Sequence, residues 1–270
     1  MSLSKTFSKQ TTKKISLLVS AFLITAPTIS TAAECSAKSG SKSTALLELY
    51  TSEGCSSCPP ADKWLSNLKS NPDKLIPLAF HVDYWDYIGW KDRFSKSEYR
   101  DRQRKVSAFG GTGFVYTPQF TLNGRDFKGL DFNNQNNSKL NESVEQQQKL
   151  ASRANLSLNT VTEQDGSITL KTNAETVNPK DAKHVDVFVA LYENKLVSQV
   201  KAGENSGREL KHDYVVRELF GAYQLNNKNM FQKNFTLKPE WKSKDAGAVI
   251  FVQDSTNGEI LQSLALKFCG

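Results

Sequence analysis

The order of apolar and polar residues divides the chain near residue 155. Before this point, short apolar runs typical of buried strands alternate with segments whose apolar residues recur at helical spacing. The predicted order is strand, helix, strand, helix, strand, strand and helix, over residues 44–50, 59–70, 75–82, 95–109, 119–122, 126–129 and 139–153. Because a helix joins the first two strands, we expect them to lie parallel with a right-handed crossover.

From residue 156 onward, the pattern predicts mainly strands. Residues 167–171 alternate between polar and apolar, and the pairs Asp165-Gly166 and Asn257-Gly258 are typical of hairpin turns. Further strands are expected over residues 185–192, 195–201, 229–237, 248–253 and 259–266, while residues 212–220 suit either a short helix or a strand. The sequence therefore predicts an α/β domain at 44–155, followed by an all-β sandwich-like domain at 156–270.

The first 33 residues have the pattern of a secretory signal peptide. Four lysines precede an apolar run at 15–26, and small residues follow at 31–33. The apolar run is too short to span a bilayer. We expect cleavage after about Ala33 and export to a periplasm or to the medium. The Ser-, Lys- and Gly-rich start of the mature chain makes 34–43 a predicted linker.

Removal of this segment changes the charge of the chain. The full sequence has 35 Lys and Arg against 28 Asp and Glu, and four of the lysines lie in the first 33 residues. The mature chain therefore has 31 against 28, which is only mildly basic. Because nucleic-acid binders usually carry a dense basic face, no nucleic-acid partner is expected.

All four cysteines lie in the mature chain, at Cys35, Cys55, Cys58 and Cys269. Export places them in an oxidising compartment, where disulfides form. Four cysteines allow three connectivities. If Cys55 pairs with Cys58, the remaining bridge joins Cys35 to Cys269 and fastens the two ends of the mature chain. The alternative is that these two cysteines are free or pair between chains.

Cys55 and Cys58 form a C-x-x-C motif at the predicted junction of a strand and a helix. A helix N-terminus favours a thiolate, and a second thiol one turn on can release a mixed disulfide. Thr117 and Pro118 precede the strand at 119–122, where a thioredoxin-type fold places a cis-proline loop against the sulfurs. The α/β domain is therefore predicted to be thioredoxin-like, with Cys55 as nucleophile. The alternative is a permanent structural disulfide with an ordinary trans proline.

Three other residues are candidates for auxiliary roles. Glu48 lies among leucines in the first strand, where it either relays a proton to the thiols or faces solvent. His81 and Asp83 are two apart and so share one side of a strand. With the two thiols they would make a copper or zinc set. We favour a buried, hydrogen-bonded His81 and a loop-capping Asp83, and we predict no metal.

Several blocks of the sequence resemble one family. They are LELYTSEGCSSCPPAD at 47–62, the segments 81–86 and 89–92, the segment 115–119, and the segment 203–208 with His212. They are similar to the secreted bacterial family known as domain of unknown function 1223. The resemblance implies a thioredoxin-like fold and export, but no particular reaction. Arg208 and His212 in the last block would bind an anion or the first domain, or lie in a solvated loop.

These observations favour an exported thiol–disulfide oxidoreductase. It would act on the cysteines of another exported protein or exchange with a membrane redox partner, and it needs no diffusible cofactor. A copper or zinc binding protein that uses Cys55, Cys58 and His81 is the first alternative. A structural module whose disulfide is inert is the second.

Overall fold

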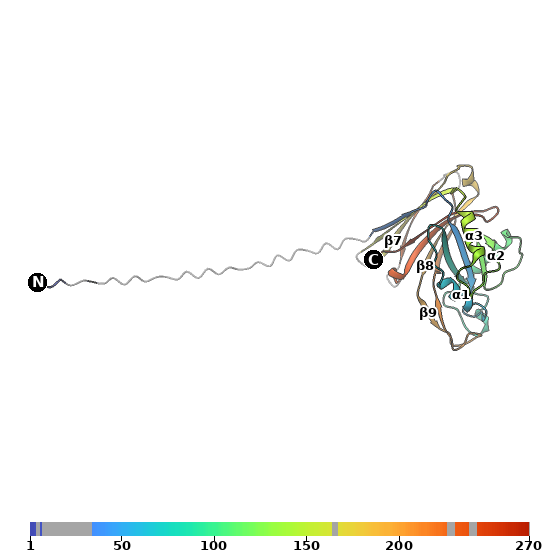
Figure 1. Cartoon of the computed structure of the whole chain (residues 1–270), viewed down its shortest axis with the longest axis horizontal. Coiled ribbons are helices and arrows are strands. Elements are labelled where there is room, and N and C mark those ends of the chain that lie inside the picture. The colour runs from blue at the N-terminus through green and yellow to red at the C-terminus, as the bar shows by residue number, and fades with distance from the viewer. Residues whose placement is uncertain (4–5, 7–33, 164–166, 226–229, 238–241, 270) are drawn as a thin grey trace. The chain divides into compact units, whose positions relative to one another are not determined.

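The computed structural model describes residues 1–3, 6, 34–163, 167–225, 230–237 and 242–269 (Figure 1). The predicted signal peptide lies almost entirely outside these residues. Ala32–Gly270 group as one compact unit. No helix among the described residues has the length and apolar content needed to cross a membrane.

Two fully buried strands lie in the middle of the largest sheet. They are β2 (Ala45–Thr51) and β3 (Leu75–His81), and all seven residues of each are buried. The two strands are parallel, as predicted, and α1 (Pro59–Ser66) joins them. Two prolines begin α1, where their missing N–H groups are not needed by the helix.

The other elements of this half follow the predicted order. They are α2 (Ser97–Phe109), β4 (Gln119–Leu122), β5 (Arg125–Asp126) and α3 (Ser138–Gln147), with a short 3-10 turn at Asp86–Ile88. Strand β4 is antiparallel to β2, and β5 turns back along β4. Asn123 and Gly124 in this turn have φ values of 50° and 76°. That left-handed pair is what a tight hairpin requires, so the predicted hairpin is confirmed.

Strands from the second half extend the same sheet. They are β8 (Val185–Glu193), β11 (Val215–Gln224), β13 (Ala246–Asp254) and β14 (Ile260–Lys267). The sheet has eight strands in the order β14-β13-β8-β11-β3-β2-β4-β5. Strand β11 joins the two halves, because Val215 pairs in parallel with Ala79 on β3. The segment at 212–220, left open between helix and strand, is therefore mostly strand.

The predicted fold class, an α/β thioredoxin-like domain followed by a separate all-β sandwich-like domain, is wrong. Strands dominate the described residues, and one mixed sheet contains strands from both 44–155 and 156–270. The misleading feature was the second half. Strand β8 is buried at all nine positions and β13 at eight of nine, as in the interior of a large sheet. From the sequence, these segments are assigned to a separate β-sandwich, whereas here they pair within the large mixed sheet.

A second, antiparallel sheet covers one face of the first. Its order is β1-β6-β7-β12, with β1 (Glu34–Lys38), β6 (Ala154–Thr162), β7 (Ile168–Thr176) and β12 (Met230–Leu237). Strand β7 alternates strictly between buried and less buried positions. Its buried residues share one core with β8 and β13. Two short strands, β9 (Leu196–Gln199) and β10 (Glu209–His212), form a separate hairpin.

The predicted linker at 34–43 is partly wrong, because its first five residues are strand β1. They pair with β6 along their whole length. Cys35 on this strand is bonded to Cys269, with the two Cα atoms 6.1 Å apart. The bridge fastens β1 to the other end of the chain, as predicted. Polar composition concealed the strand, since edge strands are often polar.

A buried ion pair links the helices to the sheet. The guanidinium of Arg102 on α2 donates to the carboxylate of Glu48 on β2 at 2.7 Å, and both side chains are at most 5% exposed. Arg102 also donates to Gln253 on β13. Its guanidinium lies over the rings of Phe188 and Phe251, 4.9 and 4.8 Å from their centroids. One side chain thus contacts strands from both halves of the chain.

Replacing Arg102 by methionine should destabilise the protein by roughly 3–5 kcal/mol, because it leaves the Glu48 carboxylate buried without its partner. Chemical denaturation measures this loss. The control is Arg104→Met, two residues along the same helix with a 62% exposed side chain, which should change stability by less than about 0.5 kcal/mol. Equal effects of the two substitutions would contradict this role of Arg102.

Candidate functional site

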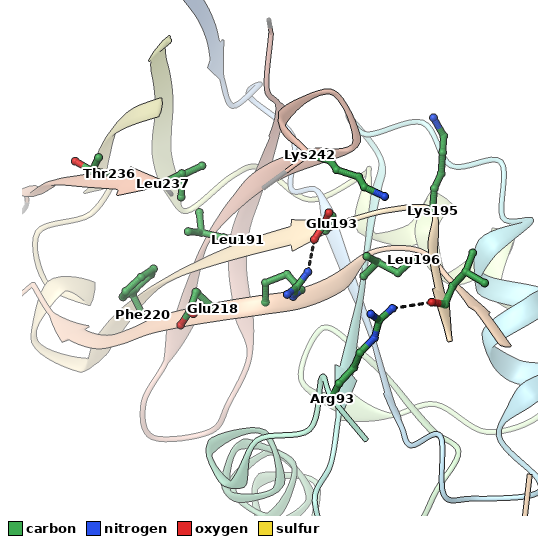
Figure 2. Close-up of a pocket in the computed structure, with 12 residues that line it drawn as sticks. Arg93, Leu191, Glu193, Lys195, Leu196, Glu218, Phe220, Thr236, Leu237 and Lys242 are labelled. Carbon is green, nitrogen blue, oxygen red and sulfur yellow. Dashed lines mark hydrogen bonds and ion pairs between the residues drawn. The ribbon is translucent and has the colours of Figure 1, made fainter. Parts of the chain in front are cut away.

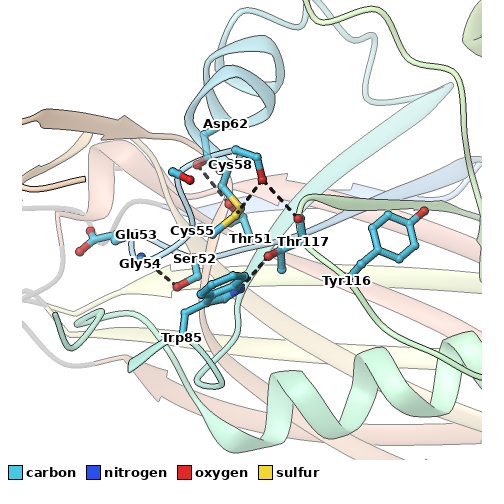
Figure 3. The surroundings of a disulfide bond; sticks show 12 residues. Thr51, Ser52, Glu53, Gly54, Cys55, Cys58, Asp62, Trp85, Tyr116 and Thr117 are labelled. Atoms are coloured by element: carbon cyan, nitrogen blue, oxygen red, sulfur yellow. Dashed lines mark hydrogen bonds between the residues drawn. A yellow bond between two sulfur atoms is a disulfide. The ribbon is translucent and has the colours of Figure 1, made fainter. Parts of the chain in front are cut away.

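The C-x-x-C motif forms the turn between β2 and the start of α1. Cys55 and Cys58 are joined in a disulfide, with their Cα atoms 5.4 Å apart (Figure 3). Cys58 is the N-cap residue of α1, and Cys55 precedes it by one turn. Both residues are buried, at 1% and 0% exposure, whereas Ser56 and Ser57 between them are exposed. The bond therefore lies just beneath the surface.

The loop before β4 meets this turn, as predicted. The hydroxyl of Ser57 lies 3.3 Å from Cys55 Sγ and 3.5 Å from the carbonyl oxygen of Thr117. The Thr117–Pro118 peptide is cis. The indole N–H of Trp85 donates to Thr117 Oγ1 at 2.7 Å (Figure 3). These contacts hold the Thr117 carbonyl and the disulfide on either side of one serine hydroxyl.

The close approach of Trp85 accounts for the glycine at position 54. A Cβ added at Gly54 would lie 2.9 Å from Trp85 Cβ and 3.2 Å from the Trp85 carbonyl oxygen. Only a residue without a side chain lets the two segments approach so closely. The glycine before Cys55 therefore serves the packing of the site.

A buried ion pair supports the turn from below. His81 Nδ1, at the end of β3, lies 2.6 Å from Asp92 Oδ2, and neither side chain is exposed. Asp92 also accepts the backbone N–H groups of Glu53 and Phe94. Burial would lower the pKa of His81, but the Asp92 carboxylate outweighs it and raises that pKa above its ordinary 6.5. Burial would raise the pKa of Asp92, but His81 holds it below 3.8.

Three more ionisable groups complete this layer. Glu53 Oε1 lies 3.4 Å from His212 Nε2, and Glu53 Oε2 accepts the indole N–H of Trp90. Burial would raise the pKa of Glu53, but the facing His212 lowers it. Asp62 follows Cys58 by one turn of α1 and accepts the hydroxyl of Thr51. Burial raises the pKa of Asp62.

The loop between β9 and β10 covers the motif. The Asn205 amide, which is fully buried, donates to the carbonyl oxygens of Glu53 and Cys55 at 2.8 and 2.9 Å. The Glu204 carboxylate accepts the N–H of Ser56 at 2.9 Å. Arg208 in turn donates to Asn205 Oδ1. The loop residues are thus bonded to the backbone of the motif itself.

The family model described as "Protein of unknown function (DUF1223)" matches residues 46–253. This chain belongs to the DUF1223 family. The resemblance found in the sequence is therefore confirmed. Membership assigns no reaction, because the family has no known function. No curated protein matches the chain.

Two solved structures resemble this DUF1223 protein in fold. The protein AGR_C_4864 from Agrobacterium tumefaciens is 24% identical, with a TM-score of 0.59 over 84% of this chain and 96% of that one. HBP35 of Porphyromonas gingivalis is 15% identical, with a TM-score of 0.61 over 85% of this chain and 76% of that one. At such identities the likeness concerns the fold alone.

The site of this DUF1223 member contains some of the predicted residues and not others. Ser57 lies between Cys55 and the carbonyl oxygen of Thr117, whose peptide bond to Pro118 is cis. His81 is paired with Asp92, which bonds the backbone of Glu53 next to the motif. Glu48 does not face solvent, because its side chain is fully buried. It is paired with Arg102. Asp83 points to Arg100, 2.9 Å away at the surface, and not to His81. Among the described residues, no group of three or more His, Cys, Asp or Glu is arranged to hold a metal ion.

Several residues of the site were not predicted. Periodicity gave no signal for five polar residues, of which Asp62 lies on α1 and the others lie in loops: Asp92, Glu53, Asp62, Asn205 and Glu204. All five nevertheless lie in the segments that resemble the family, 47–62, 89–92 and 203–208. The segment 203–208 and His212 resembled a family block although the segment contains no predicted element. In the structure His212 is 2% exposed, so the solvated-loop interpretation is wrong for His212. Arg208 is exposed, and it donates to Asn205, whose amide contacts the motif.

The Asp92→Asn variant should lose roughly 3–5 kcal/mol of stability at pH 5–6, because it leaves a buried imidazolium without its partner. The folded pKa of His81 is raised, so the pair's contribution is complete below pH 6.5 and disappears as pH rises through that pKa. The folded pKa of Asp92 is lowered, so the contribution holds above pH 3.8 and disappears as pH falls. Denaturant unfolding across pH measures the difference.

The matched control is Asp83→Asn, which removes a partly exposed ion pair with Arg100 and should cost less than about 1 kcal/mol. A difference between wild type and Asp92→Asn that stays constant from pH 5 to pH 10 would show that the pair does not carry the proposed charge.

Proposed function

We propose that this protein is an exported thiol–disulfide exchange protein whose reactive group is the Cys55–Cys58 bond. One observation carries the proposal. The disulfide begins a helix, and the hydroxyl of Ser57 lies between Cys55 Sγ and the backbone of Thr117. A purely structural bridge within a four-residue turn closes too small a loop to add much stability, since the gain rises with loop length.

The exchange takes place in two displacements. A thiolate of the partner protein attacks Cys55 Sγ, the Cys55–Cys58 bond breaks, and Cys58 leaves as a thiolate. A second partner thiolate then attacks its own sulfur in the mixed disulfide and releases Cys55 as a thiolate. The partner loses two electrons and gains a disulfide, and this protein gains two electrons and two thiols. The same steps in reverse reduce a partner disulfide.

Neighbouring groups support these steps. The Ser57 hydroxyl has one hydrogen, which it can donate either to the Thr117 carbonyl oxygen or to Cys55 Sγ. Donation to sulfur would stabilise a Cys55 thiolate. Asp62 lies one turn after Cys58 on the same side of α1. Because burial raises its pKa, Asp62 holds a proton more readily than an exposed aspartate and can supply it to the Cys58 thiolate.

Export and a cysteine-containing exported partner are part of this proposal. The basic and apolar pattern of residues 1–33 supports export. Two disulfides in one chain support an oxidising compartment. A membrane redox partner would restore the oxidised or reduced form after each cycle. No diffusible cofactor enters either displacement.

Substitution of each cysteine tests the assignment. Cys55→Ser should lower the rate of exchange with a disulfide-containing or reduced model protein by at least about 100-fold, since the attacked sulfur is absent. Cys58→Ser should instead accumulate a mixed disulfide at Cys55, because no resolving thiol is present. Non-reducing electrophoresis and mass spectrometry detect both results. The control is Ser56→Ala, whose exposed side chain lies between the cysteines and should not affect the rate.

A Cys55→Ser variant that exchanges at the wild-type rate would contradict the proposal. So would a Cys58→Ser variant that captures its partner through a residue other than Cys55.

A further inference from the structure

The strands β9 and β10 form a hairpin that stands apart from both large sheets. We call residues 195–214 the cover hairpin. Its strands pair with each other, from Leu196 opposite His212 to Gln199 opposite Glu209, and among the described strands they pair with no other. In Figure 1 the hairpin, labelled at β9, extends from the end of the eight-stranded sheet near α1, and β10 contacts α1.

The inner side of the cover hairpin lies over the disulfide and its polar support. Six of its residues are at most 7% exposed, and they are Leu196, Ser198, Val200, Asn205, Leu210 and His212. At the tip, Asn205 and Glu204 bond the backbone of Glu53, Cys55 and Ser56. A partner thiolate that attacks Cys55 along the direction of the S–S bond must reach a residue that is 1% exposed. Movement of the cover hairpin would release the Cys55 carbonyl oxygen and the Ser56 N–H from Asn205 and Glu204 and so loosen the turn that holds the disulfide.

Both ends of the cover hairpin carry unusual backbone. Lys195 has φ 55° and Tyr214 has φ 58°, a left-handed conformation that is rare for a non-glycine residue and rarer for a bulky one. They lie where the chain leaves β8 and where it enters β11. Local bonds hold them, because Lys195 N–H donates to Asp213 Oδ1 and Tyr214 N–H donates to Asn194 Oδ1. Strain of this kind occurs at hinges and switch segments.

The interface under the cover hairpin is polar and incompletely bonded. Both imidazole nitrogens of His212 and the Nε2 of His81 are buried without a hydrogen bond of normal geometry among the described residues. The rings lie edge to face, 4.9 Å between centroids. A buried polar group without a hydrogen bond destabilises the closed state, and it can bond water when the cover hairpin opens. In a permanent core most buried polar groups are hydrogen-bonded, and among the described residues of this interface several are not.

A cavity of about 670 Å³ lies beside the base of the cover hairpin (Figure 2). Leu196 and Val197 line it from the hairpin side, and Leu191 and Phe220 line it from the large sheet. Across this space, Arg93 donates to the carbonyl oxygen of Val197 at 2.7 Å. The base of the hairpin is therefore not tightly packed on this side and has room to turn.

We infer that the cover hairpin is a hinged gate, which turns at residues 195 and 214 between a closed state that shields Cys55–Cys58 and an open state that exposes it. The inference rests on the proposed function for its purpose, since a gate over a reactive disulfide restricts exchange to partners that meet the open state. The bonds from Asn205 and Glu204 are the latch of the closed state.

A small reductant tests the gate without any protein partner. Dithiothreitol reduces Cys55–Cys58 to two thiols and is oxidised to its cyclic disulfide, so no exchange activity is needed. Asn205→Ala removes two hydrogen bonds of the latch and should raise the rate of this reduction about tenfold or more under native conditions. Glu204→Gln, at an exposed position, should raise it about two- to fivefold. Alkylation and mass spectrometry of the Cys55–Cys58 peptide measure the rate.

The matched control is Glu209→Gln, an exposed carboxylate on the same hairpin that bonds Gln199 instead of the motif. It should leave the rate within twofold of wild type. Amide hydrogen exchange gives a second readout in folded protein. The N–H of Ser56 should exchange faster in Glu204→Gln, and that of Leu49 in the buried strand β2 should not change.

The gate is contradicted if wild type is reduced as fast as a short C-x-x-C peptide, or if neither latch variant exceeds the Glu209→Gln rate. The two proposals can fail separately. If latch variants speed reduction by dithiothreitol but Cys55→Ser exchanges with protein substrates at the wild-type rate, the gate holds and the proposed function fails. If the latch variants have no effect but Cys55→Ser is inactive, the gate fails and the function holds.

Discussion

The hydrogen bonds from Asn205 to the carbonyl oxygens of Glu53 and Cys55 decide how this molecule can use its disulfide. They place a loop from the second half of the chain directly on a motif from the first half. The loop bonds the backbone on either side of Cys55, and both cysteines are buried although they lie next to exposed serines. Chemistry at Cys55 is therefore coupled to the movement of residues about 150 positions away.

Buried charge gives the site its rigid base. His81 and Asp92 lock the end of β3 to the loop that follows it, and Asp92 also holds the backbone N–H of Glu53 beside the motif. Glu48 and Arg102 do the same for β2 and α2. Separating either pair would leave an unpaired charge in the protein interior, which is strongly unfavourable. Both pairs therefore hold the elements that they join in one arrangement. The rigid base contrasts with the cover hairpin, whose His212 lies 3.4 Å from Glu53 but makes no side-chain hydrogen bond of normal geometry to the described residues.

The sequence predicted local structure well and global structure poorly. The parallel pair β2 and β3, the Asn123-Gly124 hairpin and the Cys55–Cys58 disulfide follow from short-range patterns. The Cys35–Cys269 bridge, between residues 234 apart, was predicted only as the pairing of the two remaining cysteines. The continuous sheet does not, because the pairing of Val215 with Ala79 joins segments more than 130 residues apart. The partners of Glu48 and His81 were equally hidden. A carboxylate in an apolar strand implies a partner, but nothing in the sequence points to Arg102, 54 residues further on.

The equilibrium reduction potential of Cys55–Cys58 tests the central claim, that this bond is reactive, most directly. Quantitative alkylation in buffers of defined thiol–disulfide ratio measures it, and Cys35–Cys269 in the same molecule serves as an internal reference. The account predicts a value between about −270 and −120 mV for Cys55–Cys58, the range of exchange proteins, and a lower value for the terminal bridge. A potential below about −300 mV for Cys55–Cys58 would mark a structural bond and contradict the account.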